Sequence, residues 1–126
     1  MVHMNLYAAW IGILLGVLVG AGQGLFFDRE DWLGGYAAWP RRMLRLGHIS
    51  FFGLAFINLA FALTAREAGL DGGVGLSSTL LVAGAVTMPL VCYLSAWRKP
   101  FRHLFFVPVL SVLAGVAGFL WRLVPS

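Results

Sequence analysis

Two histidines, His48 and His103, are the residues of this chain best suited to holding a cofactor. Each lies just inside one end of a long apolar run, and we expect both at similar depth on two helices that run in the same direction. Neutral imidazole is a common metal ligand and can hold haem iron. One hypothesis is that the pair ligates one haem b from opposite faces. The alternative is that both are hydrated, unliganded residues at a membrane surface.

Arginines gather close to both histidines and would suit the carboxylates of a haem. Arginine forms short, charge-assisted hydrogen bonds with such groups. The propionate contacts predicted by the haem hypothesis are Arg41, Arg42, Arg45, Arg98 and Arg102.

Sulfur side chains offer a second, softer set of ligands. Met88 and Cys92 are four residues apart and so share one face of a helix. Together with His48 they would form a copper site, which would suit a metal or small-solute carrier. The favoured interpretation is simpler: Met and Cys fill an apolar interior.

Polar and proline residues interrupt the apolar runs at a few positions. Asn58 lies mid-run and needs a hydrogen-bonding partner, for which Gln23 and Thr87 are the candidates. Pro89 and Pro108 are each expected to kink a helix and free a carbonyl, with Thr87 a candidate partner near Pro89. No Asp or Glu falls inside a run, which argues against a carboxylate-based ion pathway.

Glycine recurs every four residues in the first apolar run. This spacing places the four glycines along one stripe of a helix, where another backbone or a flat ligand can approach closely. The predicted helix-packing residues are Gly12, Gly16, Gly20 and Gly24. The sequence leaves open whether the stripe packs within the chain, against a second copy or against another subunit.

Composition identifies the solvent around these residues as lipid. The 126 residues are 60% hydrophobic and 11% charged, whereas a soluble domain is about 45–50% apolar and about 25% charged. The net charge of +4 comes from basic residues at the ends of apolar runs. We therefore expect a lipid bilayer as the partner and no nucleic acid.

Four runs are long enough to cross a bilayer as helices. We place the spans at residues 6–27, 46–65, 76–97 and 103–123 of a single membrane domain, 1–126. The runs are continuously apolar and show no alternation, which favours helices over strands. The predicted fold is all-α: a four-helix transmembrane bundle with short loops.

Basic residues are concentrated on one side of this bundle. The first and third loops hold seven of the nine Lys and Arg residues, and the other side holds only Arg66 and Arg122. The positive-inside rule then puts these loops in the cytoplasm and both termini on the non-cytoplasmic side. The composition is compatible with a bacterial inner membrane.

In outline, the arrangement of His48, His103 and the nearby arginines is similar to the four-helix cytochrome b-type anchors of respiratory complexes. The resemblance implies a small subunit that binds haem and serves electron transfer. Two alternatives stay open: a non-catalytic accessory or oligomerising membrane protein, and a carrier. The chain lacks phosphate-loop, zinc-hydrolase and serine-nucleophile motifs, so we do not expect catalysis of its own.

Overall fold

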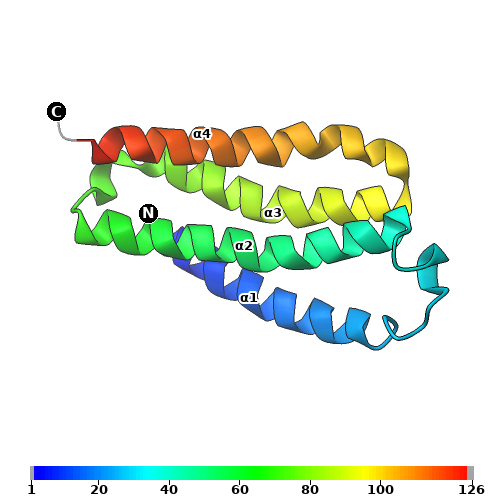
Figure 1. Cartoon of the computed structure of the whole chain (residues 1–126). Coiled ribbons are helices and arrows are strands. Elements are labelled where there is room, and N and C mark those ends of the chain that lie inside the picture. Colours follow the sequence, from blue (N-terminus) through cyan, green and yellow to red (C-terminus); the bar gives the residue numbers. More distant parts are fainter. Residues whose placement is uncertain (1, 125–126) are drawn as a thin grey trace.

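The computed structural model describes residues 2–124, which form four long α-helices and no strand (Figure 1). The all-α prediction is confirmed over this range. The helices are α1 (Val2–Gly24), α2 (Trp39–Glu67), α3 (Gly75–Trp97) and α4 (Phe106–Leu123), and short 3-10 helices in the connections are η1 (Trp32–Gly34), η2 (Asp71–Gly73) and η3 (Lys99–Phe105). By length and composition, α1, α2, α3 and the segment Lys99–Leu123 could each cross a membrane.

Consecutive helices run in opposite directions and lie side by side. α2 and α3 pack against each other, α1 flanks α2, and α4 flanks α3 (Figure 1). The connections 25–38 and 98–105 therefore lie at one end of the bundle, which we call the cationic end. Seven basic residues lie there, in these connections and the first turns of α2: Arg29, Arg41, Arg42, Arg45, Arg98, Lys99 and Arg102.

Three helix starts differ from the predicted ones by three residues or more, and α1 begins at Val2 instead of residue 6. α2 begins at Trp39 instead of residue 46, because Pro40 suits a first turn and arginine is a good helix former. α4 begins at Phe106 instead of residue 103, since residues 99–105 adopt 3-10 geometry. The apolar run marks where hydrocarbon would begin and not where a helix begins.

The two prolines behave differently from each other. Pro89 lies inside α3, as expected. Pro108 also lies inside a membrane-length helical segment, Lys99–Leu123, but near the junction where η3 passes directly into α4, at the third residue of α4. The Thr87 hydroxyl donates to the carbonyl of Ala83 at 2.7 Å and not to the carbonyl that Pro89 frees.

At the end opposite the cationic end, α2 closes with a left-handed residue. Gly69 has φ +70°, and the Leu70 amide reaches back to the carbonyl of Ala65 at 2.8 Å. This is the pattern of a Schellman cap, in which glycine avoids the steric cost of positive φ.

The apolar core lies at this same end, where all four helices meet. Its buried residues are Phe61, Ala62, Ala65, Val74 and Leu81, and Leu6, Leu70, Val112 and Phe119 pack against them. The rings of Phe61 and Phe119 are 4.7 Å apart in an edge-to-face arrangement. Beyond this core, α1 and α4 expose most of their outward apolar side chains.

Candidate functional site

Two asparagines and a serine join α1, α2 and α3 inside the bundle. Asn5, Asn58 and Ser78 are all fully buried. The Asn5 amide donates to Asn58 Oδ1 at 2.7 Å and to the Ser78 carbonyl at 3.2 Å, and the Ser78 hydroxyl donates to Asn5 Oδ1. Asn58 also donates to the carbonyls of Leu54 and Leu81, at 2.8 and 3.2 Å.

This asparagine network leaves little capacity for a ligand. The amide groups of Asn5 and Asn58 form hydrogen bonds within the protein, so the network serves to hold α1, α2 and α3 together. The partners predicted for Asn58 were wrong: neither Gln23 nor Thr87 contacts it. Asn5 was missed because it precedes the predicted span, although α1 in fact begins at Val2.

Gln23 and Tyr93 form a second tie, between α1 and α3 nearer the cationic end. Gln23 Nε2 donates to the Tyr93 hydroxyl at 2.9 Å, whereas Gln23 Oε1 is buried without a partner. The Tyr93 ring also lies over Gly47 of α2, where an added Cβ would be 2.8 Å from it.

Three of the four predicted packing glycines face α2. A Cβ at Gly12 would lie 3.2 Å from Ala55, one at Gly16 would lie 2.8 Å from the Phe52 ring, and one at Gly20 would overlap the His48 imidazole. Gly24, in contrast, has open space around its Cβ position. The stripe therefore makes room for two rings of α2 within the chain.

The structure does not bring the two predicted haem ligands together. His48 is half-buried against α1, and its Nε2 donates to the carbonyl of Gly16 at 3.0 Å. His103 is exposed in η3, which packs against α3 and α4. The second histidine is thus part of an irregular surface segment and not of the helix on which it was predicted.

The residues of the softer ligand set lie on two neighbouring helices, His48 on α2 and Met88 and Cys92 on α3. Cys92 is fully buried, and its Cβ lies close to Gly47, while Met88 is half-buried. Within residues 2–124, no three His, Cys, Asp or Glu side chains group closely enough to hold a metal. Cys92 fills space between α2 and α3.

Arg41 is buried at the cationic end without a carboxylate partner. Its guanidinium donates to the carbonyls of Phe27 and Arg29, at 2.9 and 3.0 Å, and lies 5.0 Å from the Phe27 ring centre. Its Nε has no partner. Arg41 therefore fixes the connection 25–38 onto α2 through carbonyl and cation–π contacts.

The other arginines predicted to contact a haem propionate differ in how free they are. Arg45 donates to the Tyr36 carbonyl at 2.8 Å and covers the Tyr36 ring at 4.0 Å. Arg42 and Arg102 are exposed; Arg42 lies 5.6 Å from the Trp39 ring centre, and Arg102 donates to the Lys99 carbonyl at 3.3 Å. These two arginines present a cationic surface to the surroundings.

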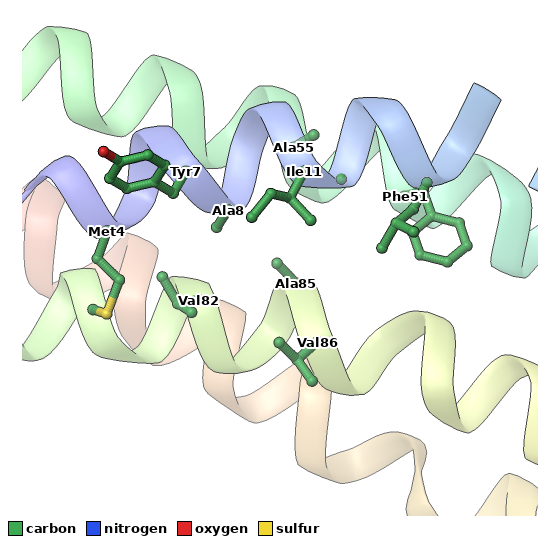
Figure 2. A pocket seen from close by; sticks show the side chains of 11 residues that line it. Met4, Tyr7, Ala8, Ile11, Phe51, Ala55, Val82, Ala85 and Val86 are labelled. Carbon is green, nitrogen blue, oxygen red and sulfur yellow. The ribbon is translucent and has the colours of Figure 1, made fainter. Parts of the chain in front are cut away.

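An apolar groove of about 410 Å³ opens between α1 and α3, with α2 contributing to its wall (Figure 2). We call it the α1–α3 groove. Small residues from all three helices, such as Ala8, Ala55 and Ala85, lie along it. Its lining is Met4, Tyr7, Ala8, Ile11, Gly12, Leu15, Phe51, Ala55, Val82, Ala85 and Val86.

The groove is apolar and elongated. From Met4 to Leu15 it follows α1 for about 17 Å at 1.5 Å per residue. It was not predicted from the sequence, because it lies between α1 and α3, two helices that are not consecutive in sequence and whose relative placement hydropathy does not give. Small residues recurring on three helices were its only signal.

Comparison of the chain with protein families, with curated proteins and with solved structures finds no match.

Proposed function

We propose that this chain is an integral membrane protein whose four helices cross a bilayer, with the cationic end in the cytoplasm and both termini on the other side. Large apolar side chains point outward: Leu25, Leu76 and Trp121 are 75, 75 and 81% exposed. Apolar exposure on this scale is unfavourable in water and favourable in lipid. The excess of basic residues at one end supports the orientation. A bacterial inner membrane is the proposed location.

Within the membrane, we propose an accessory role: the α1–α3 groove seats a transmembrane helix of another subunit or of a second copy. The single observation that carries this proposal is that the groove is apolar and that small residues of three helices lie along it between larger apolar side chains. Small residues allow close helix approach, and van der Waals contact is a main source of helix association in lipid. The glycines of α4, in contrast, face α3: a Cβ at Gly115 would meet Leu81 at 3.1 Å, and one at Gly118 would meet Ser77 at 3.0 Å.

Photocrosslinking from inside the groove tests this role. Tyr7 lines the groove and is 71% exposed, so Tyr7→benzoylphenylalanine places a reactive ketone there with little change in shape. The matched control is Trp121→benzoylphenylalanine, on α4 outside the groove. We expect irradiated native membranes to yield one discrete protein adduct from position 7 and none from position 121. Adducts with lipid alone would contradict the proposal.

Haem b binding and electron transfer stay predictions, and the geometry does not favour them. His48 Nε2 is already bonded to Gly16, and the two histidines contact different parts of the bundle. The check is an absorption spectrum of protein purified with ample haem supply. A Soret band lost in both His48→Ala and His103→Ala would restore the haem hypothesis.

A carrier role also stays a prediction. Transport of a polar solute needs polar groups that can bind it along a path. The asparagine network, however, is fully buried, and its amides bond to one another and to backbone carbonyls.

A further inference from the structure

A second hollow, of about 370 Å³, lies on the surface of η3 at the cationic end. One part of its lining is apolar, from Pro100, Phe101 and Leu104, and the other part is basic, from Arg98 and His103. All of these side chains except the half-buried Phe101 are exposed. The hollow thus joins an apolar surface to a cationic rim.

The charge of this segment is not compensated. Residues 97–105 contain Arg98, Lys99 and Arg102 and no Asp or Glu. The Arg98 guanidinium lies 5.1 Å from the Trp97 ring centre and, within residues 2–124, has no hydrogen bond. In the connection 25–38, in contrast, three carboxylates accompany a single arginine. The excess of basic over acidic residues is therefore larger in 97–105 than in the connection 25–38.

The two parts of the hollow match the two parts of one kind of molecule. Guanidinium and imidazole N–H groups bind phosphate oxygens, and basic pockets at the cytoplasmic ends of membrane helices bind anionic headgroups. Exposed apolar side chains follow the hollow in α4, where Phe106, Val107 and Leu110 are 58, 41 and 55% exposed. An acidic protein would satisfy the rim but leave this apolar continuation uncovered.

We infer that the η3 hollow binds an anionic glycerophospholipid, with its phosphate at Arg98 and His103 and an acyl chain along Leu104 and α4. This site rests on the proposed membrane insertion but not on the helix-docking role of the α1–α3 groove.

The test uses the full chain purified in dodecyl maltoside, with phosphatidylglycerol and phosphatidylcholine of identical acyl chains added in equal amounts. Native mass spectrometry then counts the lipids retained. We expect phosphatidylglycerol to bind at least fivefold more tightly, and Arg98→Gln to weaken it by about fivefold without changing phosphatidylcholine binding. Arg98→Lys keeps the charge and should keep most of the preference. The control, Arg66→Gln, removes an exposed arginine at the opposite end and should change nothing.

Several results would contradict the proposal that the η3 hollow binds an anionic lipid. Equal binding of the two lipids would do so, as would equal losses in Arg98→Gln and Arg66→Gln. Displacement of phosphatidylglycerol by millimolar inorganic phosphate would show a site for free anions. A chain that remains in the membrane on carbonate extraction but lacks lipid preference contradicts only this site, whereas an extractable chain contradicts the membrane proposal itself.

Discussion

Asn5 and Asn58 are 53 positions apart in sequence, yet their side chains form the shortest tie between α1 and α2 at 2.7 Å. In an apolar interior an amide without partners costs free energy, and the buried amides here are bonded. Asn58 could be recognised from the sequence as a residue needing a partner. The partner itself could not, because it depends on how the two helices are rotated against each other.

Truncating Asn58 should destabilise the bundle. Asn58→Ala leaves the Asn5 amide short of an acceptor, and we expect a loss of about 1–3 kcal/mol in the free energy of unfolding. The measurement is denaturant unfolding in mixed micelles followed by circular dichroism. Thr87→Val is the control, since that hydroxyl bonds only within its own helix, and it should stay within about 0.5 kcal/mol. Equal effects of the two substitutions would refute the structural role of the network.

A second prediction at the scale of single residues concerns Arg41. Arg41→Gln removes the guanidinium that holds the carbonyls of Phe27 and Arg29, so the connection 25–38 should open more often. We expect limited proteolysis within this connection to accelerate several-fold, because cleavage follows local opening. Arg42→Gln, at an exposed neighbour, should leave the cleavage rate unchanged. The burial of Arg41 was not predictable, because five other arginines lie at the same end of the bundle.

At the scale of elements, the glycines of α1 determine how closely α1 approaches α2. Their four-residue spacing was visible in the sequence, but the helix that packs against them was not. The structure gives the reason: the rings of Phe52 and His48 occupy the space that the glycine side chains would need. Helix ends were the least predictable feature, since the basic first turns of α2 and the 3-10 segment before α4 are not marked by hydropathy.

Adding a methyl group should therefore have opposite effects along this stripe. Gly16→Ala would bring a Cβ to 2.8 Å from the Phe52 ring, and overpacking of this kind costs about 1–3 kcal/mol. Gly24→Ala has open space and should be neutral or slightly stabilising. Thermal unfolding in detergent compares the two, and Phe52→Leu combined with Gly16→Ala should recover part of the loss. Failure of that rescue would mean that Phe52 is not what limits the approach of α1.

At the scale of the whole molecule, the up-and-down path of the chain places the connections 25–38 and 98–105 at one end (Figure 1). Helix number and order were predictable, because four apolar runs with short connections allow few other arrangements. The α1–α3 groove was not predictable, since it depends on how two helices that are not consecutive in sequence lie against each other.

The orientation across the membrane gives a prediction for labelling of intact cells. Cys92 is buried and would be replaced in Cys92→Ala, after which a single cysteine is introduced by Ala37→Cys or by Gly72→Cys. We expect a membrane-impermeant maleimide to label position 72 at once and position 37 only after lysis. The reverse pattern would place the cationic end outside the cell.

The central claim is that hydrocarbon surrounds α1, α2, α3 and α4, and extraction of membranes at alkaline pH with carbonate tests it most directly. Peripheral proteins leave the membrane under these conditions, whereas chains with spanning helices stay until detergent is added. The account predicts that the full chain remains in the pellet with carbonate and is released only by detergent. Release into the aqueous fraction as a monodisperse species without detergent would contradict it.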